Sequence, residues 1–252
     1  MKLISFKKMQ NSGKKNLFII PFFFTFGNAL CGFLSVINTL EEEYFTAALF
    51  IILAACMDLC DGRLARWFGS TSVLGMELDS LCDAISFCFA PAIMLYSWSL
   101  YQLGTFGMIV LGLYLCAGLF RLARFNISSV NQTNSFIGLP TTIAAFFFAN
   151  VVLYESWIAQ SSFAAMVRPE RIAFIVAVIA LLMISSIKFP SLKAVKMKIS
   201  TGLLSIVGLA FAIWCFVKGY PLFLMISAGY IVISFLISIF REITKSWWAT
   251  NN

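Results

Sequence analysis

Long apolar runs are the feature of this 252-residue sequence that most restricts its fold. A helix needs about 20 apolar residues to cross the hydrocarbon core of a bilayer. Eight runs come close to that length, at approximately 17–40, 44–62, 80–100, 105–122, 137–155, 171–188, 200–217 and 221–240. Because 61% of the residues are hydrophobic and only 12% are charged, a soluble domain with a polar exterior is excluded. We predict an all-α, polytopic transmembrane helical bundle of about eight helices.

The positions of the basic residues predict how this bundle is oriented. Loops that stay in the cytoplasm are enriched in lysine and arginine. With a cytoplasmic N-terminus, fifteen of the 18 basic residues lie on the cytoplasmic side, and only Arg168, Arg171 and Lys218 lie outside. We therefore expect N- and C-termini in the cytoplasm and the protein in the inner (cytoplasmic) membrane. The same asymmetry explains the net charge of +7, which attracts anionic membrane lipids and does not indicate a nucleic-acid partner.

All four aspartates of the chain lie within 26 residues, in or beside apolar runs where a charge is costly. Asp58 and Asp61 are three residues apart at the cytoplasmic end of the second run, and Asp79 and Asp83 are four residues apart at the start of the third. At about 100° per helical residue, each pair lies on one helix face. A turn through 68–74 would bring the two faces together, so that four carboxylates converge.

Four converging carboxylates repel one another unless cations neutralise them. Ligand sets made only of oxygen favour Mg²⁺, Mn²⁺ or Ca²⁺, and such ions stabilise phosphoryl displacements. The chain has no histidine, which excludes Ser-His-Asp and Cys-His nucleophiles and histidine metal sites. One alternative is an ion-pair network that only holds helices together, with Arg63, Arg66, Arg121 and Arg124 as partners. Another is a divalent metal-ion transporter, which predicts acids near the bilayer midplane and a continuous pore.

The residues around the aspartates form a specific pattern. From Asp58 to Asp83 the sequence reads D-L-C-D-G-R-L-A-R, eight further residues, then G-M-E-L-D-S-L-C-D. It matches without gaps the signature D-x-x-D-G-x-x-A-R-x8-G-x-x-x-D-x-x-x-D and so resembles the CDP-alcohol phosphotransferase family. The resemblance implies a transmembrane enzyme, usually a homodimer, in which a hydroxyl group attacks a CDP-linked lipid or alcohol and displaces CMP.

The resemblance also implies roles for individual residues. Asp58, Asp61 and Asp79 would bind Mg²⁺ or Mn²⁺, while Asp83 would share a metal and act as the general base. This agrees with the composition, because without histidine a carboxylate must accept the proton. The residues expected to border the CDP moiety are Asp58, Gly62, Ala65, Arg66 and Gly75.

Other segments bear on the acceptor alcohol. They are Pro21-x3-Thr25-x2-Asn28-x3-Gly32, Phe120-Arg121-Leu-Ala-Arg124-Phe-Asn126, Gly138-Leu-Pro140-Thr141 and Lys188-Phe-Pro190-Ser191. Together they resemble the membrane-embedded phosphatidylserine synthases of bacteria and archaea within the same family. That likeness implies CDP-diacylglycerol and L-serine as substrates.

Arg121 and Arg124 lie three residues apart at the depth of the aspartates. Either is expected to bind the serine carboxylate or the lipid phosphate, and the alternative is that both are anchors at the membrane surface. Asn28 and Asn126 are further candidates for the acceptor site, and Asn28 alternatively bonds across helices. Synthases of phosphatidylglycerophosphate, phosphatidylinositol phosphate or phosphatidylcholine stay open as alternatives, although an acceptor that carries phosphate should need a larger cationic cluster.

The runs and the motif divide the chain into four parts. Residues 1–16 form a basic segment that either lies at the cytoplasmic interface as an amphipathic helix or is a tail that sets topology. Residues 17–190 are the predicted catalytic core of six transmembrane helices. Residues 191–240 add two helices that serve packing or dimerisation, and 241–252 form a cytoplasmic tail.

Overall fold

The computed structural model covers most of the apolar part of the chain. The residues that it describes are 19–67, 73–130, 136–161, 167–185, 188–189, 221 and 223–235. The basic segment 1–16, the predicted span at 200–217 and the predicted tail at 241–252 lie outside the described residues.

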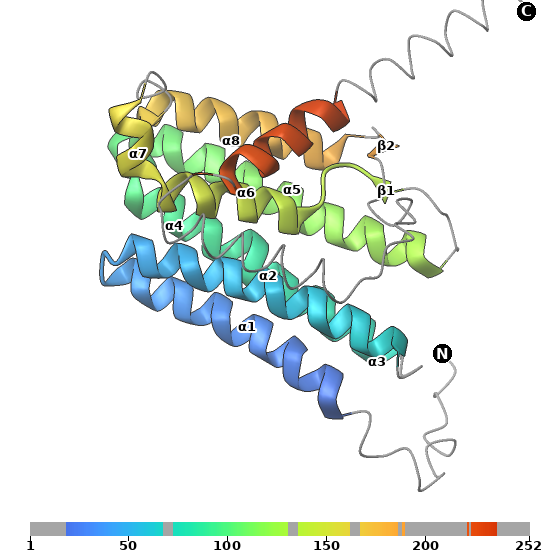
Figure 1. Cartoon of the computed structure of the whole chain (residues 1–252). Coiled ribbons are helices and arrows are strands. Elements are labelled where there is room, and N and C mark those ends of the chain that lie inside the picture. Colours follow the sequence, from blue (N-terminus) through green and yellow to red (C-terminus); the bar gives the residue numbers. More distant parts are fainter. Residues whose placement is uncertain are drawn as a thin grey trace, which may run out of the picture.

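Helices that alternate in direction make up the described structure (Figure 1). Their bounds are α1 Ile19–Leu40, α2 Tyr44–Trp67, α3 Val73–Asp83, the π-helical segment η3 Ala84–Phe89, α4 Ala90–Trp98, the 3₁₀ turn η4 Leu100–Leu103, α5 Thr105–Val130, α6 Thr141–Leu153, α7 Glu155–Gln160, α8 Pro169–Ile184 and a last helix Phe223–Phe235. Two strands of two residues each, β1 (Phe136–Ile137) and β2 (Lys188–Phe189), pair antiparallel with Phe136 opposite Phe189. Apart from this short pair, the described elements are helical, which confirms the predicted helical class.

Within the described residues, four helical stretches are long and apolar enough to cross a membrane. They are Phe22–Leu40, Tyr44–Gly62, Leu74–Trp98 and Thr105–Ile127. The helices α6 and Phe223–Phe235 are also apolar but shorter. Large apolar side chains on α1, among them Phe23 and Phe33, are exposed as expected of a surface that contacts lipid. The chain is therefore a membrane protein, and the total of eight spans stays a prediction.

Helices α3 and α5 extend beyond the apolar runs from which they were predicted, as does α2, which continues past residue 62 to Trp67. Helix α3 begins at Val73, so the predicted turn at 68–74 is too long and Asp79 and Asp83 lie well inside a helix. Helix α5 continues to Val130, beyond the run that ends at 122. The physical reason is the same in all three places. A hydropathy run ends at charged residues, whereas backbone hydrogen bonding continues through residues of adequate helix propensity.

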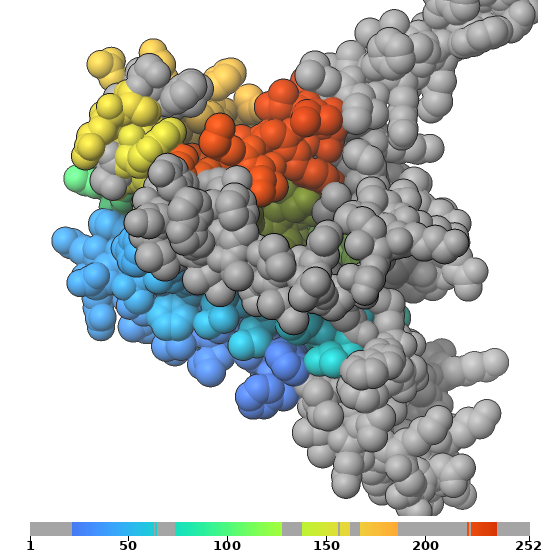
Figure 2. Space-filling view, viewed as in Figure 1, coloured from blue at the N-terminus to red at the C-terminus, as the bar shows by residue number. Residues whose placement is uncertain are grey.

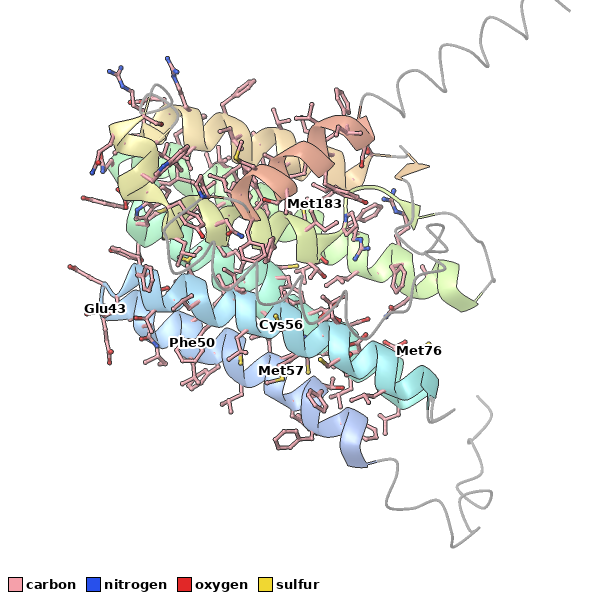
Figure 3. All side chains as sticks on the ribbon, in the orientation of Figure 1. Glu43, Phe50, Cys56, Met57, Met76 and Met183 are labelled. Carbon is pink, nitrogen blue, oxygen red and sulfur yellow. The ribbon has the colours of Figure 1, made fainter. Side chains whose placement is uncertain are left out.

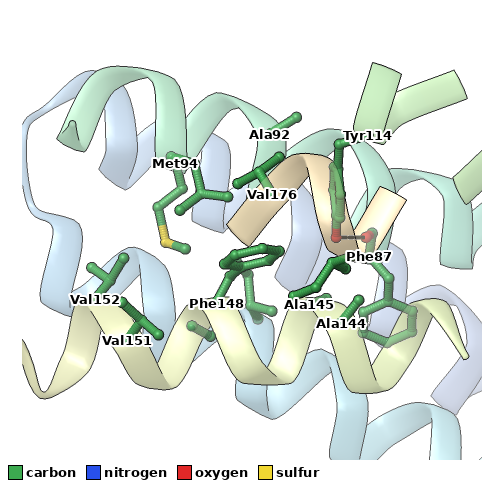
Figure 4. Close-up of a cluster of buried hydrophobic side chains, with 14 of the residues drawn as sticks. Phe87, Ala92, Met94, Tyr114, Ala144, Ala145, Phe148, Val151, Val152 and Val176 are labelled. Atoms are coloured by element: carbon green, nitrogen blue, oxygen red, sulfur yellow. Dashed lines mark hydrogen bonds between the residues drawn. The ribbon is translucent and has the colours of Figure 1, made fainter. Parts of the chain in front are cut away.

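The segment η3 interrupts the regular helix directly after Asp83. Pro91, at the start of α4, has no N–H for the carbonyl of Phe87 four residues earlier. The buried hydroxyl of Tyr114 on α5 donates a hydrogen bond of 3.0 Å to that carbonyl (Figure 4). Because a carbonyl without a partner is costly in an apolar interior, Tyr114 stabilises this irregular segment.

The core lies between α2, α4, α5, α6 and α8. The ring of Phe148 on α6 packs edge-on against Tyr114, with 5.7 Å between ring centroids, and Met94 and Val176 lie beside it (Figure 4). The helix Phe223–Phe235 lies against α6 (Figure 2). There the rings of Phe146 and Phe223 make an edge contact at 6.1 Å.

Candidate active site

Alternating helix directions bring the polar parts of five helices to one end of the bundle. The turn that carries Glu43 lies at one end, and Met76 on α3 lies toward the other (Figure 3). The second end receives the last turns of α2 and α5, the start of α6 and the N-terminal parts of α1 and α3. Helix α1 packs against α3, and α2 packs against α6. Residues from separate apolar runs therefore meet in one place.

Three of the four aspartates form a group at this end. Carboxylate oxygens of Asp58, Asp61 and Asp79 all lie within 4.8 Å of one another. Asp58 and Asp79 are half-buried, and Asp61 is buried with 5% of its surface exposed. The i, i+3 spacing on α2 places its two carboxylates on one face, and α3 supplies the third from the opposite direction.

The oxygens of this group fit a divalent cation. Within the described part of the chain, Asp61 Oδ2 and Asp79 Oδ1 are buried and receive no hydrogen bond. A buried carboxylate oxygen without a donor is costly unless a cation or water meets it. A set made only of carboxylates suits a hard ion such as Mg²⁺ or Mn²⁺. The residues present therefore fit the metal that the sequence predicts.

Asp83 has a different environment. Its Oδ1 accepts a hydrogen bond of 2.9 Å from the amide Nδ2 of Asn28, which is fully buried on α1. The Ser86 hydroxyl donates to the backbone carbonyl of Asn28 at 2.8 Å, which ties the same turn of α1 to η3. Gly32, one turn further along α1, lies so close that a Cβ there would collide with Ser86. The missing side chain allows α1 and η3 to approach closely enough for Asn28 to reach Asp83.

Arg121 on α5 faces the same end of the bundle. It is 8% exposed, its Nη1 donates a hydrogen bond of 3.2 Å to Thr141 Oγ1, and its guanidinium lies 5.3 Å from the ring centroid of Phe125. It is near enough to Asp83 and Asp58 for electrostatic attraction. The next residue of α6, Thr142, makes a side-chain hydrogen bond to Asp58. The start of α6 thus contacts both the cation of α5 and the acids of α2.

The other two candidates on α5 have different neighbours. Arg124 donates hydrogen bonds to three backbone carbonyls at the end of α8. Asn126 accepts a hydrogen bond of 2.9 Å from Ser80 on α3, and its Nδ2 lies 3.4 Å from Glu77 Oε2. Asn126 therefore links α5 to the helix that carries Asp79 and Asp83.

The residues expected to border CDP lie along the same helices. Gly62 follows Asp61 on α2, its backbone N–H bonds to the Asp61 carboxylate, and it is half-buried. Gly75 is half-buried in the first turn of α3. Ala65 and Arg66 belong to the last turns of α2, and their side chains lie outside the described residues.

These positions bear on the two alternative interpretations. The hydrogen bonds that the structure shows for Arg121 and Arg124 run to Thr141 and to carbonyls at the end of α8, and Arg121 is also attracted by Asp83 and Asp58. The side chains of Arg63 and Arg66 lie outside the described residues. Asp58 and Asp61 lie at the end of the apolar stretch Tyr44–Gly62 and not at its middle. Their position at the end of an apolar stretch disfavours a transport site at the bilayer midplane.

Two contacts of this site were not predicted from the sequence. Thr142 and Ser86 are small polar residues of a kind that is common in membrane helices. Only the packing of α6 against α2, and of α1 against η3, gives them their partners. The available signal was the Pro140-Thr141-Thr142 sequence at the start of an apolar run, which favours a helix start.

Several known proteins have sequences similar to that of this chain. The family model of CDP-alcohol phosphatidyltransferase matches residues 18–239. A CDP-diacylglycerol–serine O-phosphatidyltransferase of Helicobacter pylori is 31% identical over 195 residues, which cover 77% of this chain and 81% of that protein. The protein of the same description in Bacillus subtilis is 33% identical over 174 residues, which cover 69% and 91%.

An archaeal relative extends the comparison. The archaetidylserine synthase of Methanothermobacter thermautotrophicus is 33% identical over 185 residues, which cover 72% of this chain and 74% of that protein. Divalent metal ions are typical of the family that the model represents, in agreement with the carboxylate group of Asp58, Asp61 and Asp79. Since the family model spans most of the sequence, the chain belongs to the CDP-alcohol phosphatidyltransferase family.

Proposed function

We propose that this protein transfers the phosphatidyl group of CDP-diacylglycerol to the hydroxyl of L-serine and so makes phosphatidylserine. The observation that carries this proposal is the group of Asp58, Asp61 and Asp79 beside an Asp83 that Asn28 holds. The choice of serine is supported by the relatives of H. pylori and B. subtilis, whose descriptions name CDP-diacylglycerol and serine. The archaeal relative is also described as making a serine lipid.

Each residue of the site has its own role in the proposed reaction. Asp58, Asp61 and Asp79 would hold Mg²⁺ or Mn²⁺, with Asp83 sharing an ion, and such an ion would supply positive charge to neutralise the phosphates. Asp83 accepts the proton of the serine hydroxyl. The serine oxygen then forms a bond to the phosphorus that bears diacylglycerol, the bond from that phosphorus to the CMP oxygen breaks, and CMP leaves. Gly62, Ala65, Arg66 and Gly75 border the CDP moiety along α2 and α3.

Arg121 is the residue that we assign to the carboxylate of serine. Its guanidinium uses Nη1 for Thr141 and is attracted by Asp83, so it lies beside the proposed base. A planar guanidinium can bind a carboxylate through two parallel hydrogen bonds. Serine held in this way would present its hydroxyl toward Asp83.

The arrangement in the cell follows from the basic residues. We propose eight transmembrane helices with both termini in the cytoplasm, an inner-membrane location and an active site that faces the cytoplasm, where serine and cytidine nucleotides are found. The domain limits 1–16, 17–190, 191–240 and 241–252 belong to the same proposal. The family resemblance supports a homodimer, for which the last two helices offer additional surface.

An assay of CMP release tests the function directly. Purified protein in detergent receives CDP-diacylglycerol, Mn²⁺ or Mg²⁺, and one of four alcohols: serine, glycerol 3-phosphate, inositol phosphate or choline. We expect release of CMP with serine and formation of phosphatidylserine. Asp83→Asn should slow turnover by about 10²- to 10⁴-fold, because a general base contributes about that much, while binding of CDP-diacylglycerol persists. Chelation of the metal should stop the reaction in the unaltered protein.

Each other outcome has a definite meaning. Release of CMP with glycerol 3-phosphate but not with serine refutes the acceptor assignment and keeps the family reaction. Unchanged turnover in Asp83→Asn removes Asp83 from the role of base. Activity that survives complete removal of divalent ions contradicts the metal site.

A further inference from the structure

The C-terminal end of α8 is capped by a residue from another helix. The last four carbonyls of a helix lack partners within it, and in an apolar protein each needs a donor. In α8 these are the carbonyls of residues 181–184. The carbonyl of Leu181 accepts a hydrogen bond from the backbone N–H of Ser185. The carbonyl of Leu182 accepts from the Ser185 hydroxyl and from the backbone N–H of Leu139.

Arg124 supplies the remaining donors. Its Nη2 donates to the carbonyl of Met183 at 3.1 Å and its Nη1 to that of Ile184 at 3.0 Å. A third bond of 3.1 Å joins Nη2 to the carbonyl of Ser185. A cation is also favoured at the negative end of the helix dipole. Every terminal carbonyl of α8 therefore has a donor, and one guanidinium provides for three consecutive residues.

Gly138 fits into the same contact. Gly138 is buried and its backbone φ is 82°, a conformation that residues other than glycine rarely adopt. A Cβ at this position would collide with Nη2 of Arg124 and with the carbonyl oxygen of Met183. The next residue, Leu139, donates its N–H to the carbonyl of Leu182 at 3.1 Å. The segment before α6 is thus fixed against the end of α8, with Arg124 between them.

This segment leads directly to the proposed active site. Three residues after Gly138, Thr141 accepts the hydrogen bond of Arg121, and Thr142 follows with its bond to Asp58. A shift of the segment Gly138–Thr142 would therefore displace both Arg121 and Asp58. Arg124 lies one turn beyond Arg121 on α5, but its hydrogen bonds run to α8 while that of Arg121 runs to α6.

We propose that Arg124 is a positioning residue, whose guanidinium caps α8 and, packed against Gly138, holds the segment Gly138–Thr142 in the place that Arg121 and Asp58 require. The effect on activity rests on the proposed function. The effect on stability does not, because it depends only on contacts within the chain.

The test uses two single variants and their combination in the full-length protein. Arg124→Gln and Gly138→Ala should each lower kcat by about 10- to 100-fold, as loss of a supporting contact commonly does, while KM for serine changes less than about twofold. Both should lower the thermal unfolding midpoint in detergent, and their combination should lower it by less than the sum, because both variants break one contact. Arg124→Lys, which keeps the charge but cannot bridge three carbonyls, should give a smaller loss of kcat.

Matched controls separate these effects from general damage. Gly112→Ala introduces a Cβ on α5 where it meets open space, and Arg171→Gln removes an exposed guanidinium from the first turn of α8. Both should retain the kcat and the unfolding midpoint of the unaltered protein.

Three results would overturn the proposal. One is a rise of about tenfold or more in KM for serine in Arg124→Gln with kcat unchanged, which would mean direct binding of the acceptor. Another is strict additivity of the two midpoint shifts. The third is full kcat and an unaltered midpoint in Arg124→Lys, since a point charge would then suffice. If the unaltered protein released no CMP with serine, the proposed function would fail, and the thermal comparison would still decide the role of Arg124.

Discussion

Asp83 differs from the other three aspartates because a buried amide holds its carboxylate. Asp61 and Asp79 each have a buried oxygen without a hydrogen bond in the described structure, as ligands awaiting a cation would. Asp83 instead accepts from Asn28, whose own backbone accepts from Ser86. A group that must take a proton in a defined direction benefits from such a contact, because the hydrogen bond fixes which oxygen faces the substrate. Asp83 therefore has different surroundings from Asp61 and Asp79.

Substitution of Asn28 tests this contact. Asn28→Ala removes the donor to Asp83, and we expect kcat to fall by about 10- to 100-fold, the usual effect of losing a partner of a functional side chain. Asn38→Ala is the matched control, since Asn38 lies on the same helix and its side chain donates to the backbone carbonyl of Leu34, one turn earlier. CMP release measures both. Equal activity in the two variants would show that Asp83 needs no support from α1.

At the scale of the helix, the irregular segment after Asp83 depends on a partner on α5. Pro91 cannot donate to Phe87, and the Tyr114 hydroxyl reaches that carbonyl from a position with no exposed surface. The contact joins the helix of the aspartates to the helix of Arg121. Here a tyrosine within one membrane helix donates a hydrogen bond to the backbone of the neighbouring helix.

Removing the Tyr114 hydroxyl should destabilise this junction. Tyr114→Phe keeps the ring that packs on Phe148 but leaves the carbonyl of Phe87 without this donor, at a cost of about 1–3 kcal/mol. Thermal unfolding in detergent measures the loss. Tyr101→Phe is the control, because Tyr101 is 55% exposed in the η4 turn and should tolerate the change. An unchanged midpoint in Tyr114→Phe would mean that another group satisfies the carbonyl.

The helices themselves were predictable and their ends were less so. Apolar runs located α1, α2 and α5 because crossing a bilayer requires length and hydropathy together. They missed the start of α3, since Glu77 and Asp79 lower the hydropathy of a segment that is nevertheless helical. The spacing of the aspartates predicted a shared face, because helical periodicity is local. The bonds of Thr142 and Arg124 were not predictable, since they depend on how α6 and α8 pack.

At the scale of the whole molecule, one end of the bundle holds the described groups that the proposed reaction uses. Helices that alternate in direction bring residues from five elements to that end, while the acidic turn Glu41–Glu43 lies at the opposite end. A donor that stays in the membrane and an acceptor dissolved in water can meet only near a membrane surface. The excess of basic residues predicts that this surface is the cytoplasmic one.

Labelling of introduced cysteines tests this orientation. Glu41→Cys, at the exposed turn, should react with an impermeant maleimide in intact spheroplasts, whereas Ser12→Cys in the basic segment should react only after permeabilisation. The protein without either change is the control for its seven native cysteines. The reverse pattern would place the aspartates on the outer side and contradict a cytoplasmic active site.

The π-helical segment Ala84–Phe89 has a consequence for how this helix tolerates change in length. A π turn holds one residue more than an α turn, so everything beyond it is rotated by about 100° relative to an unbroken helix. If the same residues formed a regular α-helix, Met94 and Leu95, which have no exposed surface, would be rotated by about 100° from their present positions in the core, whereas deletion of a single residue would remove the π turn and keep them there. The extra residue therefore lets one helix present two faces that a regular α-helix could not present together: the aspartates before the π turn, and the apolar side chains that pack in the core after it.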